Sequence, residues 1–127
     1  MKIALTSVFV DDPNKAFTFY TETLGFIKRV HIPEAHLAIV ASPEDPDGTG
    51  LLLEPNGNLG AAAFQKGIYE AGLPYIVFGV EDIQQEYERL KARGVVFRSE
   101  PTTSEYGTAA IFEDTCGNLI QIHQAGN

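Results

Sequence analysis

Residues 8–25 read VFVDDPNKAFTFYTETLG, and residues 78–94, FGVEDIQQEYERLKARG, repeat that pattern later in the chain. The matching positions stay 70 apart until one residue is dropped before the closing glycine. Four positions correspond in type: Val10, Asp12, Phe17 and Gly25 fall on Val80, Asp82, Tyr87 and Gly94. A second correspondence, DGTGLLLE at 47–54 with DTCGNLIQ at 114–121, ends each copy. An internal repeat of this kind predicts two copies of one structural unit.

The first copy contains the signals of one helix and four strands. Residues 3–10 are rich in β-branched and aromatic types, which favours a strand. Asp12 followed by Pro13 is typical of a helix start, and Gly25 stands where the helix would end. Three further strands are expected at 26–30, 36–42 and 49–54. The order of elements in this copy is therefore β-α-β-β-β.

The second copy predicts the same order. Its strands are expected near 74–80, 95–99, 107–113 and 118–124, with a helix at 82–93. Between the copies, GAAAFQKGIYEAG at 60–72 predicts a short linking helix. A chain of 127 residues fits one domain. We expect an α+β domain over 1–127, with a first unit at 1–56, a linker at 57–73 and a second unit at 74–127.

Composition and charge narrow the class of partner. The formal charge of −8, from 17 acidic and 9 basic residues, disfavours binding to nucleic acid phosphates. No apolar run approaches the roughly 20 residues of a membrane span, so no membrane partner is expected. The single cysteine, Cys116, has no internal partner for a disulfide, which suits a reducing compartment. We therefore predict a cytoplasmic protein.

Alternation along the strands assigns side chains to two faces of the sheet. One face is nearly all apolar, as expected beneath a helix: Ala4, Val8, Val10, Leu51, Leu53, Ile76, Phe78, Val80, Ile120 and Ile122. The other mixes apolar and polar groups: Ile3, Leu5, Ser7, Phe9, Leu52, Glu54, Tyr75, Val77, Leu119, Gln121 and His123. Mixed walls of this kind are typical of a ligand cavity.

Two βαβββ units that carry FYTETLGF at 19–26 and DTCGNLIQIHQ at 114–124 resemble the vicinal oxygen chelate superfamily. That superfamily includes glyoxalase I, metal-dependent epimerases, extradiol dioxygenases, fosfomycin-inactivating thiol transferases and bleomycin-binding resistance proteins. The resemblance covers essentially the whole chain. It implies a single glyoxalase-like domain in which the two units form a curved mixed sheet around a concave cavity.

The resemblance also implies four metal-ligand positions, which fall here on Leu5, Glu54, Tyr75 and Gln121. Leu5 has no donor atom, and a tyrosine binds mainly hard Fe(III)-like ions, so the usual divalent metal site is broken. We therefore favour no metal and no other cofactor. A displaced site formed by Glu54, Gln121 and His123 stays open as the alternative, and it would hold Zn, Ni, Fe or Mn.

The predicted ligand-binding residues are Leu5, Ser7, Glu54, Tyr75, Gln121 and His123, with Glu54 the candidate catalytic acid or base. Simpler explanations stand beside these roles. His123 near a strand end suits a rim histidine in contact with water, and Tyr75 suits a core aromatic. His31 and His36 flank a short connection and are expected to be exposed loop residues.

Two functions follow from this site. The first is a metal-free protein that binds a small molecule, either by sequestering it or by acid–base chemistry alone. The second is a divalent-metal lyase or isomerase of the glyoxalase I type, or a dioxygenase-like enzyme, that uses the displaced site. The residues leave open whether the chain is an enzyme. The resemblance further implies a homodimer.

Overall fold

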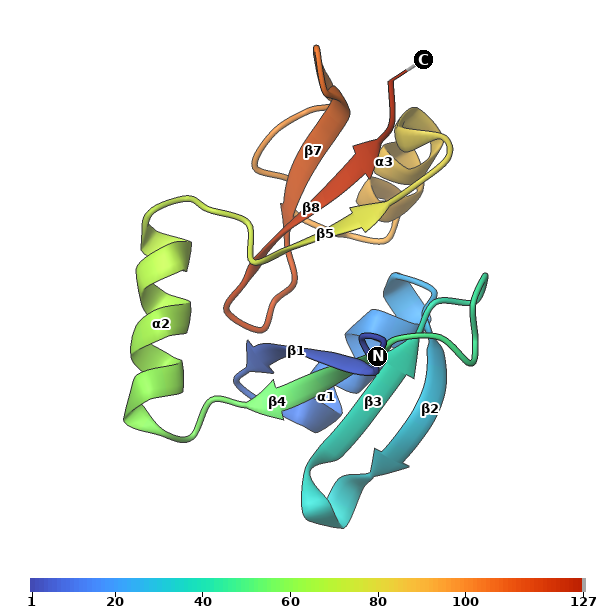
Figure 1. Cartoon of the computed structure of the whole chain (residues 1–127). Coiled ribbons are helices and arrows are strands. Elements are labelled where there is room, and N and C mark those ends of the chain that lie inside the picture. Colours follow the sequence, from blue (N-terminus) through green and yellow to red (C-terminus); the bar gives the residue numbers. More distant parts are fainter. Residues whose placement is uncertain (127) are drawn as a thin grey trace. The chain divides into compact units, whose positions relative to one another are not determined.

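The computed structural model describes residues 1–126, which form two compact units (Figure 1). Unit 1 is Met1–Gln65, and unit 2 begins at Lys66, so the boundary between them lies within the linking helix. Each unit contains its own four-stranded mixed sheet. In the part of the chain that the structure describes, no helix is both long enough and apolar enough to cross a membrane.

Unit 1 has the predicted element order. Its elements are β1 (Leu5–Val10), α1 (Pro13–Thr18), the π-helical turn η1 (Phe19–Thr23), β2 (Ile27–Ile32), the 3-10 turn η2 (Pro33–Ala35), β3 (Leu37–Ala41) and β4 (Gly50–Pro55). The strands lie in the order β1-β4-β3-β2, with β1 parallel to β4 and the other neighbours antiparallel. The helix α1 packs on β3 and β4.

The helix of unit 1 begins as predicted but ends differently. Asp12 caps it, because its side chain accepts hydrogen bonds from the backbone N–H groups of Asn14 (2.9 Å) and Lys15 (3.5 Å). From Phe19 the helix widens into the π-helical turn, in which the Leu24 N–H donates to the Phe19 carbonyl five residues earlier at 3.1 Å. The single helix expected to run on to Gly25 is therefore two helical segments.

Unit 2 repeats the arrangement. The linking helix α2 (Leu59–Glu70) leads into β5 (Ile76–Gly79), α3 (Ile83–Ala92), β6 (Thr102–Ser104), β7 (Gly107–Glu113) and β8 (Leu119–Gln124). The strands lie in the order β5-β8-β7-β6, with β5 parallel to β8. The helix α3 packs on β7 and β8, as α1 packs on β3 and β4 in unit 1. The predicted two-unit α+β fold is confirmed.

The prediction of a regular strand at 95–99 is wrong in detail. Residues 95–99 lie along β7 with one regular bridge, between Phe97 and Phe112. Farther along, the backbone N–H groups of Arg98 and Ser99 both donate to the Ile111 carbonyl, at 2.7 and 3.4 Å. The Ile111 N–H donates in turn to the Ser99 side chain at 3.0 Å. Because a side chain replaces a backbone acceptor there, the ladder is interrupted, and a regular strand, β6, forms only from Thr102.

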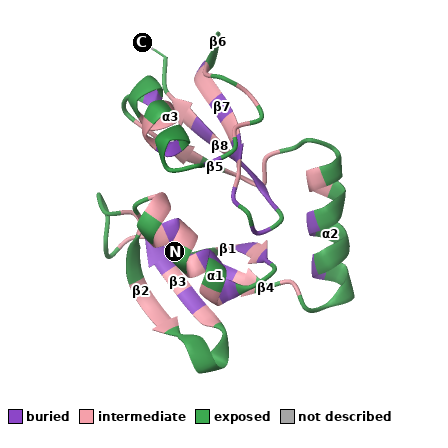
Figure 2. Ribbon diagram, turned by 180° about the vertical axis from the view of Figure 1, so that it is seen from behind, coloured by how far each residue is buried: buried purple, intermediate pink, exposed green. Residues whose placement is uncertain are grey.

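The cores lie beneath the helices, on the sheet faces that alternation had marked as apolar (Figure 2). In register, Val8 neighbours Leu53 in unit 1, and both are fully buried. In unit 2, Ile120 and Ile122 are 0% and 3% exposed. The buried members of this face agree with the assignment, whereas Ile76, Phe78 and Val80 are only half-buried. Ala4 is exposed, because β1 begins only at Leu5.

His31 corrects the expectation of an exposed loop histidine. It lies in β2, where its ring stacks on Phe17 with centroids 3.9 Å apart and its Nε2 is 3.0 Å from Asn14 Oδ1. In unit 2, Tyr87, which corresponds to Phe17 in the repeat, contacts Phe97 edge-to-face instead, with centroids 4.6 Å apart and the rings inclined by 68°. His31 is therefore a packing residue. His36 is an exposed residue of the β2–β3 connection, as expected.

Candidate functional site

In each unit one face of the sheet lies opposite the helix that packs on it, α1 in unit 1 and α3 in unit 2, and we call these the open faces of units 1 and 2. On the open face of unit 1, the parallel register of β1 and β4 places Leu5 beside Gly50, Ser7 beside Leu52, and Phe9 beside Glu54. Leu5, Ser7 and Glu54 therefore share this face. Their predicted roles in ligand binding stay predictions.

The open face of unit 2 carries the other predicted residues. Gln121 pairs with Val77 and His123 with Gly79, while the Tyr75 N–H donates to the Leu119 carbonyl at 2.8 Å just before β5 begins. Alternation from these pairs puts Tyr75, Gln121 and His123 on one side of the sheet, opposite the buried isoleucines of β8. The alternation predicted along β8 is confirmed. The grouping of both sets of residues around one cavity stays a prediction.

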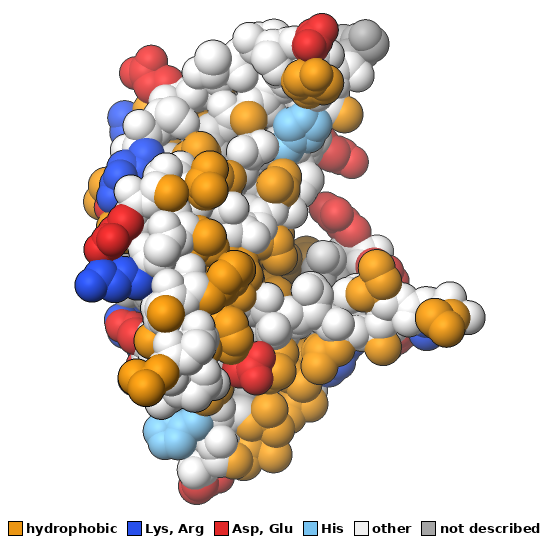
Figure 3. Space-filling model, turned by 60° about the vertical axis from the view of Figure 1, so that its left-hand side comes forward, with side chains coloured by type: hydrophobic (Ala, Val, Ile, Leu, Met, Phe, Trp, Pro, Cys, Tyr) orange, Lys and Arg blue, Asp and Glu red, His pale blue; other side chains and the backbone are white. Residues whose placement is uncertain are grey.

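Apolar side chains dominate both open faces. Leu5 and Ile32 of unit 1 are 49% and 44% exposed, and Val77 of unit 2 is 52% exposed. Figure 3 shows apolar side chains at the molecular surface among scattered carboxylates. Exposed apolar side chains that adjoin a few polar groups are what a ligand with an apolar body requires.

Glu54 is the polar group of the unit 1 open face that is most available to a ligand. It is half-buried in β4, beside Phe9. Within unit 1, no described residue forms a hydrogen bond or ion pair with its carboxylate. A half-buried carboxylate without such a partner is available to accept a proton or a hydrogen bond from a bound molecule.

His123 is held by a backbone contact rather than by another site residue. Its Nε2 lies 2.8 Å from the Tyr106 carbonyl oxygen, and since a carbonyl can only accept, Nε2 carries the proton. Gly107 makes room for the ring, because a Cβ there would be 2.8 Å from His123 Nε2 and 2.4 Å from the Gln124 carbonyl. Nδ1 is consequently the nitrogen that can accept a hydrogen bond from a ligand.

The side chains present do not fit the usual divalent metal of the superfamily. Leu5 offers no donor atom. Tyr75 supplies a phenol rather than an imidazole or a carboxylate. Among residues 1–126, no group of three or more His, Cys, Asp or Glu side chains is placed to hold a metal ion.

A polar cluster on unit 2 was missed by the sequence reasoning. Glu113, beside Leu119 on the open face, accepts a hydrogen bond from the Tyr69 hydroxyl. Arg98 Nη2 donates to the Tyr69 oxygen at 3.0 Å, and Arg98 Nε lies 3.4 Å from Glu113 Oε2. The three residues lie far apart in the chain and outside the repeated motifs. The one available signal was the alternation along 107–113, which puts Glu113 on the open face.

This cluster shifts the pKa values of its members. The hydrogen bond from Tyr69, helped by the charge of Arg98, holds the pKa of Glu113 below its ordinary value although partial burial opposes the shift. The bond to Glu113 raises the pKa of Tyr69, because losing the proton would break it. Glu113 is therefore a partnered carboxylate, in contrast with Glu54.

Comparisons with known proteins agree with this architecture. The family model described as Glyoxalase/Bleomycin resistance protein/Dioxygenase superfamily matches residues 2–122. The uncharacterized protein YurT of Bacillus subtilis (strain 168) is 54% identical over 126 residues, covering 98% of this chain and 99% of that protein. A probable lactoylglutathione lyase of Vibrio cholerae serotype O1 (strain ATCC 39315 / El Tor Inaba N16961) is 27% identical, covering 97% of this chain and 90% of that protein.

Solved structures share the fold along nearly the whole chain. UcmS2 superposes with a TM-score of 0.80 at 30% identity, covering 97% of each chain. TnmS3, an antibiotic binding protein from Streptomyces sp. CB03234, superposes with a TM-score of 0.75 at 27% identity, covering 99% of this chain and 97% of that one. The chain therefore belongs to the Glyoxalase/Bleomycin resistance protein/Dioxygenase superfamily.

Proposed function

We propose that this protein binds a small molecule with an apolar body on its open faces and does so without a divalent metal. The observation that carries the proposal is Leu5. It lies on the open face of unit 1, at a position where the superfamily resemblance calls for a metal ligand. Its neighbour across the strands, Gly50, also lacks a donor side chain.

Two further observations support the proposal. The open faces combine exposed apolar side chains with few polar groups, and apolar surface supplies most of the affinity in small-molecule sites. TnmS3, whose structure this chain resembles, is described as an antibiotic binding protein. This likeness supports small-molecule binding as the class of function.

A lyase of the glyoxalase I type is the second candidate, and Glu54 favours it. This carboxylate occupies one of the implied metal-ligand positions and has no partner within unit 1. The relative from Vibrio cholerae is described as a probable lactoylglutathione lyase. In that case Glu54 would help to hold the metal or move the substrate proton.

A fluorescence titration with N-phenyl-1-naphthylamine, a neutral aromatic probe, distinguishes the two candidates. We expect saturable binding to the full chain that changes neither with a chelator nor with added Zn²⁺ or Ni²⁺. The same protein, with and without these metals, is then assayed on the hemithioacetal of methylglyoxal and glutathione. Turnover that requires a metal, or an absence of saturable binding, would contradict the proposal.

A further inference from the structure

Arg29 places a positive charge on the open face of unit 1. The pairing of β2 with β3 shifts register between Lys28 and Val30, which makes Arg29 the extra residue of a bulge. A Cβ added at Gly50 would lie 3.0 Å from Arg29 Nη1, 3.0 Å from Ile39 Cγ2 and 3.2 Å from Leu5 Cδ1. Since Gly50 pairs with Leu5, the guanidinium, Leu5 and Ile39 meet over Gly50 on the open face.

Arg29 is fixed in place but keeps donors for a ligand. It is half-buried, and its Nη2 donates to the Pro46 carbonyl at 2.5 Å. No carboxylate among residues 1–126 forms an ion pair with it, although the chain has 17 acidic residues against 9 basic ones. A guanidinium has several N–H groups in a planar fork, so Nη1 can still donate.

The surroundings of Arg29 favour an anionic partner. Hydrogen bonds between an ionised donor and an ionised acceptor are the strong ones, and they strengthen where apolar neighbours exclude water. Leu5 and Ile39 supply such neighbours. The glycine at position 50 leaves room for this arrangement, because a Cβ there would crowd Arg29, Ile39 and Leu5 at 3.0–3.2 Å.

We propose that Arg29 is an anion-binding residue of the unit 1 open face, and that the ligand has an apolar body with one carboxylate or sulfonate group. The anionic group accepts a hydrogen bond from Arg29 Nη1 while the apolar body lies against Leu5 and Ile39. This proposal rests on the proposed function. It specifies in addition that the ligand carries a negative charge.

Two probes that differ in a single charged group test it. 8-Anilinonaphthalene-1-sulfonate carries a sulfonate, and N-phenyl-1-naphthylamine has the same rings without one. Both are titrated into the full chain and into the variants Arg29→Gln, Arg29→Lys and Lys28→Gln. Lys28 is the matched control, because it is exposed and pairs with Val40. Its side chain therefore projects from the face of the sheet opposite the open face. Thermal melting of each variant verifies its folding.

We expect Arg29→Gln to weaken binding of the sulfonate probe by about tenfold or more, the range of a lost hydrogen bond to a charged group, with little change for the neutral probe. Arg29→Lys should restore part of the loss, and Lys28→Gln should alter neither affinity. Equal effects of Arg29→Gln on both probes, or no effect on either, would overturn the role of Arg29 and leave the proposed function standing. If the unaltered protein binds neither probe saturably, both proposals fail.

Discussion

Substitution of Glu54 best distinguishes an effect on ligand binding from an effect on folding stability. Its half-buried carboxylate has no hydrogen-bond or ion-pair partner within unit 1, and burying such a group costs free energy. We predict that Glu54→Gln leaves the melting temperature equal or slightly higher and changes ligand affinity. Differential scanning fluorimetry and the titration of N-phenyl-1-naphthylamine measure the two effects. A large fall in melting temperature would instead identify Glu54 as a structural residue.

The cluster of Tyr69, Arg98 and Glu113 predicts how stability depends on pH. The pKa of Glu113 is lowered from 4.5, so its contribution to the free energy of unfolding is present above about pH 4.5 and is lost as the pH falls through the lowered value. The pKa of Tyr69 is raised from 10.0, so its contribution is present below about pH 10 and is lost as the pH rises through the raised value.

Tyr69→Phe tests this dependence, because it removes the hydroxyl that donates to Glu113. Urea unfolding between about pH 3 and pH 7 should show a shallower acid-side loss of stability in Tyr69→Phe than in the unaltered protein. Tyr87→Phe is the matched control, since the Tyr87 ring contacts Phe97 and no described residue hydrogen-bonds its hydroxyl. Identical pH profiles for Tyr69→Phe and the unaltered protein would refute the assigned role.

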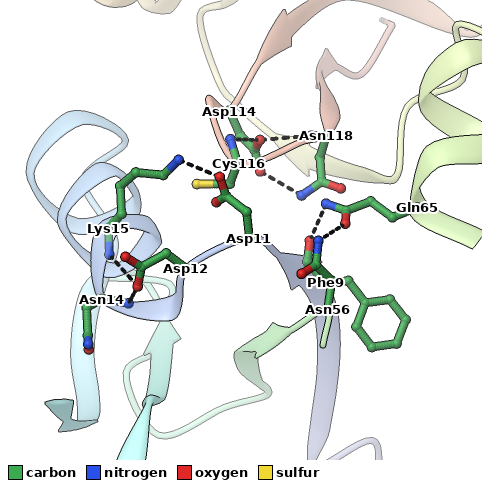
Figure 4. A network of polar contacts seen from close by, with 10 residues as sticks. All are labelled: Phe9, Asp11, Asp12, Asn14, Lys15, Asn56, Gln65, Asp114, Cys116 and Asn118. Atoms are coloured by element: carbon green, nitrogen blue, oxygen red, sulfur yellow. Dashed lines mark hydrogen bonds and ion pairs between the residues drawn. The ribbon is translucent and has the colours of Figure 1, made fainter. Parts of the chain in front are cut away.

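At the scale of elements, the turn before β8 determines which side chains reach the open face of unit 2 (Figure 4). Asp114 is fully buried and accepts hydrogen bonds from Cys116 N (2.7 Å), Asn118 N (3.0 Å) and Asn118 Nδ2 (2.8 Å). These bonds close the turn and fix where β8 starts. A shift of one residue would move Gln121 and His123 beneath α3.

We predict that Asp114→Ala lowers the free energy of unfolding by about 2–4 kcal/mol, because buried N–H groups lose their acceptor. Asp11→Ala is the comparison, since the Asp11 side chain is 51% exposed and makes a surface ion pair with Lys15. That change should cost less than about 1 kcal/mol. Urea unfolding of both variants measures the difference, and a loss for Asp114→Ala no greater than that for Asp11→Ala would contradict this account of the turn.

The elements also show what a sequence can predict here. Local signals sufficed for the cap at Asp12, the alternation along β8 and the repeat of the whole unit. The missed features depend on contacts between distant residues. The bulge at Arg29, the interruption of the ladder by Ser99 and the bond from Tyr69 to Glu113 arise only when strands and helices are packed together.

At the scale of the whole molecule, we predict a homodimer. The superfamily resemblance implies one, and closed two-fold assemblies are the commonest oligomers. Exposed apolar residues of unit 1, including Ile27 and Ile32, are consistent with further burial on assembly. Size-exclusion chromatography with light scattering at about 10 μM should return twice the chain mass of 13.8 kDa. A mass equal to that of one chain would contradict the predicted homodimer.

The central claim is that this member of the superfamily binds its ligand without a divalent metal. Elemental analysis of the full chain, produced in medium supplemented with Zn, Ni, Fe and Mn and purified without a chelator, tests it most directly. Because Leu5 has no donor atom and Tyr75 supplies a phenol rather than an imidazole or a carboxylate, we predict far less than one metal ion per chain. One tightly held Zn, Ni, Fe or Mn per chain, lost on exchange of Glu54, would contradict the account and identify the displaced site of Glu54, Gln121 and His123 as real.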